Sequence, residues 1–373
     1  MDPVHVVIPR ELRPADGRFG SGPSKVRPEA VEALAQSATG LLGTSHRQAP
    51  VRAMVGRLKE GLAQLFSLPD GYEVVLGNGG TTILWDALAL GVIDKRSQHL
   101  VFGEFSARFA EAAKLAPDLD APEVLSCDPG AHPRSRASDA VDAYALTHNE
   151  TSTGVAMPVA RVARTGLVVV DATSAAGGLA VEASDFDVYY FAPQKCFASD
   201  GGLWVALCSP AAIERIERIA ASNRYIPPSL DLTIALESSR RDQTYNTPAL
   251  ATMFLFVHQL EWMLDKGGLA WTTARCAHSA DLLYRWAESS DVAKPFVERP
   301  EQRSNVVATV DFDPEVDAGR VTAALRANGI VDTEPYRKLG RNQIRIAMFP
   351  AIDPEDIARL LRSIDYVVDV LGK

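Results

Sequence analysis

The sequence predicts an α/β fold in which a large domain with a mostly parallel, helix-covered sheet precedes a small C-terminal α+β domain. Two observations support this prediction. Short β-prone runs alternate with helical patterns up to about residue 220, which is typical of a parallel sheet covered on both faces. A second, shorter series of helices and strands follows Gly267-Gly268, and 373 residues suffice for about two or three domains.

The first 48 residues are predicted to form an arm and two loops, each ahead of a helix. Residues 1–17 carry three prolines, which favours an extended arm, and we expect it to pack with the small domain. A glycine-rich loop at residues 19–24 precedes a helix that opens at Arg27-Pro28. His46 and Arg47 lie just before the next helix. They are either anion-binding residues or ordinary surface groups.

A glycine-rich turn links the first predicted strand to a helix. Tyr72–Leu76 is the strand, 77–82 the turn, and Ile83–Leu90 the helix. The backbone N–H groups of such a turn, with the hydroxyls of Thr81 and Thr82, form a cradle for phosphate. The turn lacks the fingerprints of nucleotide P-loops and dinucleotide folds, so by itself it is weak support for a site.

Further candidate groups follow the next strands. Phe105 comes after a predicted strand that starts at Leu100, where it would lie against an aromatic ring or pack in the core. Thr151 follows the strand Ala143–Thr147 and offers a hydroxyl. Ligands of parallel sheets bind at the carboxyl ends of the strands, so these groups should converge.

An acid and a lysine at two further strand ends predict the chemistry. Residues 166–170 form a buried strand that ends at Asp171, and Val188–Phe191 leads through Pro193 to Lys195. Burial lowers the pKa of a lysine and prepares its amine to attack a carbonyl. Taken separately, Asp171 is equally well explained as an acid that caps a turn, and Lys195 as a solvated lysine of a loop. Together they are typical of a pyridoxal phosphate enzyme, in which the acid protonates the pyridine nitrogen and the lysine binds the aldehyde.

Composition limits the other classes of function. The net charge is −9, with 47% apolar and 23% charged residues and no basic stripe, which predicts a soluble protein that binds no nucleic acid. The four cysteines are scattered without paired spacing, so we expect no metal site, no disulfide framework and a cytoplasmic location. No apolar run approaches the roughly 18 residues of a membrane span.

The last third begins with Tyr245-Asn246-Thr247-Pro248, an apolar helix from Ala249 to Leu264, and a glycine hinge. Together with the proline-containing arm, this hinge predicts three parts of the chain. They are the arm at 1–17, the large domain at 18–266 and the small domain at 267–373. The small domain is expected to contain helix 269–288, strand 304–312, helix 317–328, strand 343–348 and helix 353–371.

These motifs together resemble the class V aminotransferases, which are fold-type I pyridoxal phosphate enzymes, and within them the phosphoserine aminotransferases. The resemblance covers nearly the whole chain. The matching motifs occur in the family's order: Ser21-Gly22-Pro23, Ser45-His46-Arg47, Asn149-Glu150-Thr151, Asp171, Gln194-Lys195, Tyr245-Asn246-Thr247-Pro248 and Ile344-Arg345-Ile346-Ala347.

The resemblance implies a role for each matching residue. Lys195 would be the Schiff-base lysine, Asp171 would pair with the pyridinium, Phe105 would stack on its ring, and Thr151 would bond the phenolic oxygen. Cofactor-binding residues would also include Gly80, Thr81, Thr82, Thr173, Gln194, Asn246 and Thr247. Asn246 and Thr247 would reach the cofactor phosphate from the neighbouring subunit, which implies a homodimer with shared active sites.

The resemblance also implies substrates. Arg345 would hold the substrate α-carboxylate with its two-pronged guanidinium. The reaction would be a ping-pong transfer of an amino group from glutamate to 3-phosphohydroxypyruvate in serine biosynthesis. Many members carry tryptophan in place of Phe105 and Gly-Arg in place of Thr81-Thr82.

The family's His-Arg pair for substrate phosphate is replaced here by residues 337–341. The candidates for phosphate binding are therefore His46, Arg47, Lys338 and Arg341. A class V aminotransferase acting on alanine, serine or glyoxylate is the first alternative, and a non-catalytic protein that kept the fold is another. A cysteine desulfurase is disfavoured because no cysteine follows Cys276.

Overall fold

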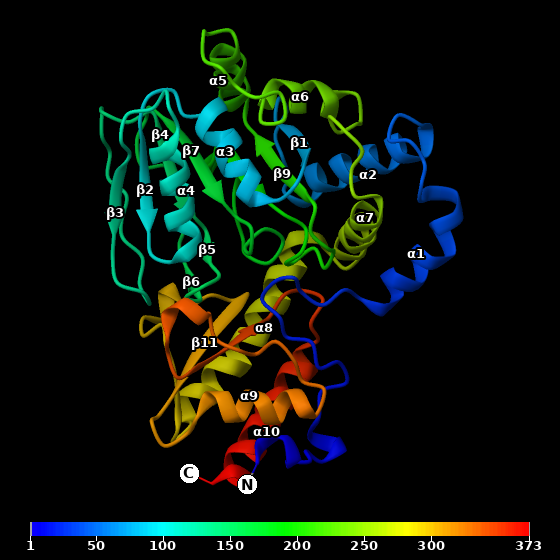
Figure 1. The fold of residues 1–373 in the computed structure, drawn as a ribbon, viewed down its shortest axis with the longest axis vertical. Helices are drawn as coiled ribbons and strands as arrows, with labels where there is room; N and C mark the ends of the chain where they lie inside the picture. Colours follow the sequence, from blue (N-terminus) through cyan, green and yellow to red (C-terminus); the bar gives the residue numbers. More distant parts are fainter. Residues whose placement is uncertain (1, 373) are drawn as a thin grey trace.

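The computed structural model describes residues 2–372, and its core is a sheet in the upper lobe of Figure 1. Within the described residues this sheet has seven strands, in the order β1-β9-β8-β7-β4-β2-β3. Their bounds are β1 (Glu73–Asn78), β2 (Ser97–Val101), β3 (Glu123–Ser126), β4 (Ala143–Thr147), β7 (Leu167–Asp171), β8 (Val188–Phe191) and β9 (Leu203–Cys208).

The sheet is mostly parallel, as predicted. The pairs of β2 with β3 and β4, β4 with β7, and β7 with β8 are parallel, whereas β9 runs antiparallel to both β8 and β1. Strands β4, β7 and β8 are buried along their whole length. Continuous apolar runs are expected for strands that are covered on both faces.

Helices cover the two faces of this sheet because alternate residues of each strand point in opposite directions. Val169 of β7 packs in one cluster with α3 (Thr81–Gly91), α4 (Glu104–Leu115), α5 (Pro210–Ala220) and α6 (Leu232–Arg240). Its neighbours Val168 and Val170 pack in another cluster with α2 (Ala49–Leu65) and α7 (Leu250–Asp265). The helix α1 (Pro28–Leu41) lies beside α7 (Figure 1).

The lower lobe of Figure 1 has its own hydrophobic core. In the described part of the chain it contains one antiparallel sheet of three strands, in the order β10-β11-β12, with three helices. These elements are α8 (Gly268–Ser289), β10 (Ala293–Pro295), β11 (Val307–Phe312), α9 (Ala318–Ala327), β12 (Gln343–Ala347) and α10 (Pro354–Leu371).

The N-terminal segment lies against this lobe, beside the C-terminus (Figure 1). The Ile8 amide donates to Asn328 Oδ1 over 3.0 Å, and Ser363 Oγ donates to the Leu12 carbonyl over 2.9 Å. The segment was expected to be extended, but it contains the short 3-10 turns η1 (Pro3–His5) and η2 (Arg10–Leu12). Proline fits the first position of such a turn because the missing N–H has no partner there. Packing against α9 and α10 agrees with the predicted arm, and the domain boundaries at 17 and 266 stay predictions.

The predicted elements agree with the structure to within a few residues, with one difference that matters for the site. Phe105 was predicted to lie in the turn after a strand, whereas it occupies the first turn of α4. The short elements not yet named are β5 (Asn149–Glu150), β6 (Val155–Ala156), η3 (Ala183–Asp185), η4 (Pro300–Gln302) and η5 (Arg337–Leu339).

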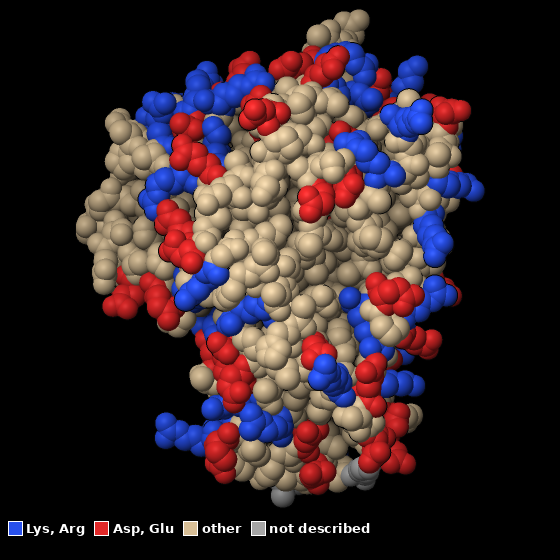
Figure 2. All heavy atoms as spheres, turned by 180° about the vertical axis from the view of Figure 1, so that it is seen from behind, with Lys and Arg blue, Asp and Glu red and all other residues tan. Residues whose placement is uncertain are grey.

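The surface carries charges of both signs. Figure 2 shows lysine and arginine interspersed with aspartate and glutamate over the face that it presents. Between residues 2 and 372, no helix is long and apolar enough to cross a membrane.

Candidate active site

The candidate groups meet at one edge of the large sheet. The parallel strands β2, β4, β7 and β8 end at this edge, and β1 runs in the same direction because β9 is antiparallel to both β1 and β8. Helices or turns that carry the predicted residues follow each of these strands. The convergence predicted from the sequence is therefore present in the fold.

Lys195 lies in the turn after β8, and its side chain is buried. Its ammonium nitrogen donates to the Ser21 carbonyl over 2.5 Å, and its own carbonyl accepts from Ser24 Oγ over 2.6 Å. Burial, assisted by the nearby positive charge of Arg345, lowers the pKa of Lys195 to about 8. A substantial fraction of this amine is therefore neutral, and nucleophilic, at moderately alkaline pH.

Gly22 leaves room for this lysine. A Cβ atom at position 22 would lie 2.0 Å from the Lys195 nitrogen, and the backbone there has a φ of +139°. Both observations exclude a larger residue, because the side chain would collide with Lys195 and the backbone conformation favours glycine. The Ser21-Gly22-Pro23 motif thus forms one wall beside the amine.

Asp171 ends β7 and is buried. One carboxylate oxygen accepts from the Thr173 amide over 2.9 Å and from the Thr173 hydroxyl over 2.6 Å. The other accepts from Trp85 Nε1 over 3.1 Å. Burial raises the pKa of Asp171, while these hydrogen bonds oppose the rise by stabilising the carboxylate.

The glycine-rich turn leads into α3, as predicted. Gly80 is the N-cap residue of this helix and Thr81 its first residue. Thr81 Oγ1 lies 3.1 Å from Thr173 Oγ1, so the turn and the Asp171 strand end are in direct contact. Thr82 is exposed. The unpaired N–H groups of a helix N-terminus and these hydroxyls are suited to a phosphate group.

Thr151 lies on the other side of the strand end. Its hydroxyl donates to Ser174 Oγ over 2.8 Å, and the Asn149 side-chain amide donates to the same atom over 2.8 Å. All three residues are buried. This network fixes the Thr151 hydroxyl at the edge of β4 and β7, where it is suited to hydrogen-bond a polar ligand.

Phe105 is held in place by the buried carboxylate of Glu150. One oxygen of Glu150 accepts from the Phe105 amide over 3.3 Å, and the other from the Ser106 amide over 2.9 Å. A carboxylate at this position stabilises the positive N-terminal end of α4. The Phe105 ring lies 6.0 Å from the ring of Tyr336, which belongs to the small lobe.

Arg345 of β12 reaches the same region from the small lobe. Its Nη1 donates to the Thr151 carbonyl over 3.2 Å, and its guanidinium lies 5.5 Å from the Tyr336 ring centroid. Burial lowers the pKa of Arg345, but arginine stays charged in proteins. The structure thus places Arg345 near Lys195, and its role toward a substrate carboxylate stays a prediction.

Lys338 and Arg341 lie in different surroundings. Lys338 Nζ forms an ion pair of 2.5 Å with Glu104, the residue before Phe105. Arg341 is paired with Asp311 and stacks on Phe296 at 4.5 Å from the ring centroid. Lys338 is therefore next to the candidate site, whereas Arg341 is bound within the small lobe.

His46, Arg47, Asn246 and Thr247 form a separate group. The Thr247 hydroxyl lies 3.3 Å from His46 Nδ1, and the Thr247 carbonyl accepts from the Asn78 side chain over 2.9 Å. Burial, followed by the charge of Arg47, lowers the pKa of His46. Arg47, Asn246 and Thr247 are exposed, so this group borders the glycine-rich turn at the surface of the chain.

Several buried polar atoms of the site have no partner within residues 2–372. They include Ser21 Oγ, Gln194 Oε1 and Arg345 Nε. Buried polar groups are normally hydrogen-bonded, so a cluster of unpaired ones indicates a missing ligand. With an amine, a carboxylate and an N-terminal helix turn alongside, the donor set fits an aldehyde cofactor with a ring nitrogen and a phosphate.

A match to the family model of class-V aminotransferases covers residues 18–334. The chain belongs to this family. It is therefore a pyridoxal phosphate-dependent aminotransferase.

Curated relatives of this family are similar along the whole length. A phosphoserine aminotransferase of Nocardioides sp. is 61% identical over 98% of this chain and 98% of its own. The phosphoserine aminotransferase of Rhodococcus jostii is 58% identical over 98% of this chain and 99% of its own.

The solved structures of aminotransferases share the fold. A phosphoserine aminotransferase of Cytophaga hutchinsonii superposes with a TM-score of 0.87 at 25% identity, over 94% of this chain and 99% of its own. An aspartate aminotransferase of Thermus thermophilus superposes with a TM-score of 0.80, also at 25% identity. Because the two have different substrates, the fold by itself does not select one.

Sequence reasoning missed four residues of the site: Trp85, Glu150, Ser174 and Tyr336. Glu150 lay within a motif quoted above, but no role was assigned to it. A hydroxyl residue three positions after the end of a strand was the only available signal for Ser174. Trp85 and Tyr336 carried none, because a tryptophan in a helix and a tyrosine in a loop are common without any function.

Proposed function

We propose that this chain is a phosphoserine aminotransferase, which transfers the amino group of glutamate to 3-phosphohydroxypyruvate and yields O-phospho-L-serine and 2-oxoglutarate. The observation that carries the proposal is the 61% identity, over nearly the whole chain, to a relative of that name. The presence of Lys195, Asp171 and Arg345 in one site supports it, because all three chemical roles are then filled.

Each role follows from the surroundings of the residue. When bound, pyridoxal phosphate withdraws electrons from the substrate α-carbon. Lys195 would hold the cofactor through its Nζ, and the same amine would carry the proton away from the substrate α-carbon. Asp171 would keep the ring nitrogen protonated, and Arg345 would orient the substrate by its α-carboxylate. Thr81, Thr82 and the N-terminus of α3 would hold the cofactor phosphate.

Lys338 is the better candidate for the substrate phosphate than Arg341. Lys338 is paired at the rim with Glu104, beside Phe105, whereas Arg341 already has Asp311 as its partner. An incoming phosphate can replace Glu104 as the partner of Lys338 at little cost in free energy, because half-exposed ion pairs are weak. His46 and Arg47 complete the phosphate site from a second subunit.

A second subunit is also proposed to complete the cofactor site. Exposed apolar side chains lie beside the glycine-rich turn: Ile83 and Tyr245 are 41% and 51% exposed. Large apolar groups around a polar loop are typical of a protein interface. A homodimer that covers them would bring Asn246 and Thr247 to the partner's cofactor phosphate. We place this enzyme in the cytoplasm, because its four cysteines are scattered along the sequence without the paired spacing of a disulfide framework.

The alternative is another amino-group acceptor, such as pyruvate, glyoxylate or unphosphorylated hydroxypyruvate. The Thermus aspartate aminotransferase at 25% identity keeps this alternative open. The deciding experiment compares phosphorylated and unphosphorylated hydroxypyruvate as acceptors, with glutamate as the donor. We expect kcat/KM to be at least about 100-fold higher for the phosphorylated acid, given two charge-assisted contacts to phosphate. Equal values would contradict the proposal and favour the alternative.

A matched pair of variants tests the phosphate contact. Lys338→Ala should lower kcat/KM for phosphoserine roughly 10-fold or more while leaving that for glutamate much less changed. Arg341→Ala removes the same charge a few residues away and should affect both substrates equally. The reverse result would transfer the phosphate contact to Arg341.

A further inference from the structure

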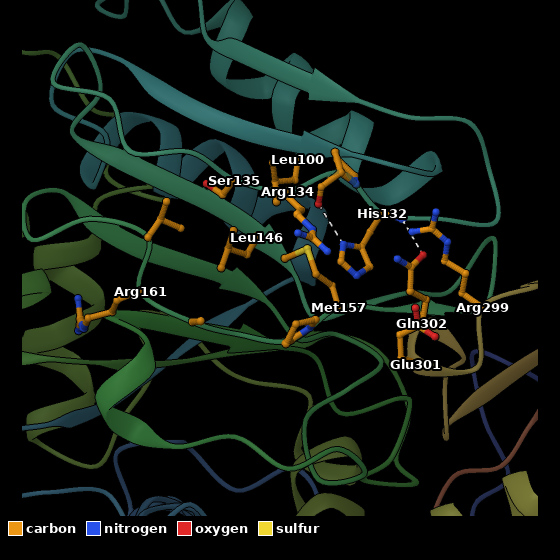
Figure 3. Close-up of a pocket in the computed structure, with 14 residues that line it drawn as sticks. Leu100, His132, Arg134, Ser135, Leu146, Met157, Arg161, Arg299, Glu301 and Gln302 are labelled. Carbon is orange, nitrogen blue, oxygen red and sulfur yellow. Dashed lines mark hydrogen bonds between the residues drawn. The ribbon is translucent and has the colours of Figure 1, made fainter.

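A second cavity, of about 620 Å³, lies outside the Lys195 site. It is bordered by β2, β4, the chain after β6, the loop 132–135, and residues 299–302 ahead of β11 (Figure 3). None of the residues assigned above to the cofactor or the substrates lines it. Its volume is that of pockets that bind small organic molecules.

One wall of this cavity is apolar. Leu100 of β2, Leu146 of β4 and Met157 are buried residues of the large lobe's core that also face the cavity. Figure 3 shows Leu100 and Leu146 from neighbouring strands above Met157. An apolar ligand placed here would remove further apolar surface from water, which favours binding.

Two unpaired arginines line the same cavity. The guanidinium groups of Arg134 and Arg299 line the cavity, and in the described chain, residues 2–372, neither forms a salt bridge or side-chain hydrogen bond. Arg134 points toward His132 and Met157 (Figure 3). Arg161, which also lines the cavity, is by contrast paired with Asp187. Glu301 contributes one opposing charge, so the two unpaired arginines leave an excess of positive charge.

His132, which also lines the cavity, connects the two lobes. Its amide donates to Gln302 Oε1 over 3.3 Å, and its Nδ1 lies 3.0 Å from the Pro133 carbonyl. Residues 299–302 lie just ahead of the small lobe's central strand, and Arg303 forms a β-bridge to Val155. Both lobes thus contribute residues to the cavity, and the β-bridge between Arg303 and Val155 joins their backbones beside it.

We propose that this cavity binds an organic anion with an apolar body, such as an aromatic or branched carboxylate. The anionic group would lie between Arg134 and Arg299, because a guanidinium binds carboxylates and sulfonates through paired N–H donors. The apolar body would lie on Leu100, Leu146 and Met157. This site is independent of the proposed function, since it shares no residue with the Lys195 group.

The test uses 1-anilinonaphthalene-8-sulfonate, an aromatic anion whose fluorescence rises on entering an apolar site. The holoenzyme should bind it saturably. The double variant Arg134→Gln, Arg299→Gln should weaken binding at least about 10-fold, since two charged contacts are lost. Ala160→Trp, which fills the cavity and keeps both charges, should also weaken it.

The matched control is Arg164→Gln, an exposed arginine of the same loop region that does not line the cavity. It should bind the probe as the wild type does. Transaminase activity of all four proteins checks that they are folded. Unchanged binding in either cavity variant, or an equal loss in the Arg164→Gln control, would overturn the proposal.

Discussion

At the scale of single residues, the site depends on how each charge is buried and partnered. Lys195 is buried near Arg345. Both the loss of solvent and the nearby positive charge favour the neutral form of its amine. Asp171 is equally buried but accepts three hydrogen bonds, which favour its charged form. The two environments thus differ: burial lowers the pKa of Lys195, whereas for Asp171 burial raises the pKa and the hydrogen bonds oppose that rise.

The first prediction concerns the pH at which Lys195 reacts. Its pKa is lowered to about 8, so the rate at which apoenzyme takes up pyridoxal phosphate should rise with a midpoint near pH 8 rather than near 10.5. Arg345→Met removes a positive neighbour, which raises the pKa of Lys195 and should move the midpoint to higher pH. Stopped-flow absorbance of apoenzyme mixed with cofactor measures both.

The control for that experiment is Arg341→Met, whose guanidinium is paired with Asp311 and should leave the midpoint unchanged. Lys195→Ala should show no such reaction at all. A wild-type midpoint near pH 10.5, or a midpoint that is unchanged in Arg345→Met, would show that Lys195 is not held as the structure indicates.

The second prediction concerns Trp85. Trp85→Phe removes the indole N–H that donates to Asp171, so the pKa of Asp171 should rise further and its pairing with the cofactor nitrogen weaken. A hydrogen bond to a charged group contributes about 1.5–3 kcal/mol, which corresponds to a loss of roughly 10-fold or more in kcat/KM. Steady-state kinetics over a range of pH measures the loss and its pH dependence.

Trp286→Phe is the matched control for this change. Trp286 also donates its indole N–H to an aspartate, Asp365, over 2.7 Å, but on the surface of the small lobe. Its loss should leave kcat/KM unchanged. If both variants behaved alike, the effect at Trp85 would be one of general packing.

At the scale of elements, α4 shows how a helix terminus is used to position a side chain. The first turn of α4 holds Phe105, and the Glu150 carboxylate accepts both amides of that turn as well as the Ser106 hydroxyl. Gly103 precedes the helix because a Cβ atom there would lie 2.3 Å from the Glu150 side chain. The loop after β4 therefore fixes where the Phe105 ring lies.

The third prediction tests that contact. Glu150→Ala leaves buried amides without an acceptor and should destabilise the protein by about 1–3 kcal/mol. It should also weaken cofactor retention, because Phe105 loses its support. Urea unfolding and the dissociation rate of the cofactor measure the two effects.

Asp231→Ala serves as a comparison, since Asp231 caps α6 by accepting from the Thr233 amide over 2.8 Å. It should cost a similar free energy of unfolding without any change in cofactor retention. Equal cofactor loss in both variants would contradict the positioning role of Glu150.

At the scale of the whole molecule, the site is built across two lobes and, as proposed, two subunits. Arg345 and Tyr336 come from the small lobe and meet Thr151 and Phe105 of the large one. The fourth prediction is that Lys195→Ala chains, mixed with chains carrying Asn246→Ala and Thr247→Ala, recover activity. Each heterodimer would contain one site with an intact lysine and an intact pair of partner residues.

Refolding each variant separately provides the baseline, and chains labelled with different affinity tags allow heterodimers to be isolated. Their specific activity should approach about half that of the wild type, since one of two sites is intact. Purified heterodimers without activity would exclude the shared site.

The sequence by itself determined the fold class and the order of the elements, and it singled out most of the residues that are proposed for the cofactor site. Apolar runs such as residues 167–170 can be recognised locally, because strands buried on both faces need them. Asp171 and Lys195 could be found because the carboxyl ends of parallel strands converge whatever the side chains are. Family resemblance then assigned their roles.

Only the tertiary structure decided which side chains meet across the sheet edge and between the lobes. Trp85 and Asp171 are 86 residues apart, and Lys338 and Glu104 are 234 apart, so no local pattern relates them. Lys338 and Arg341 were indistinguishable in sequence, yet one faces Glu104 and the other Asp311. Contacts of this kind depend on how the lobes pack, and packing is set by the whole chain rather than by any segment of it.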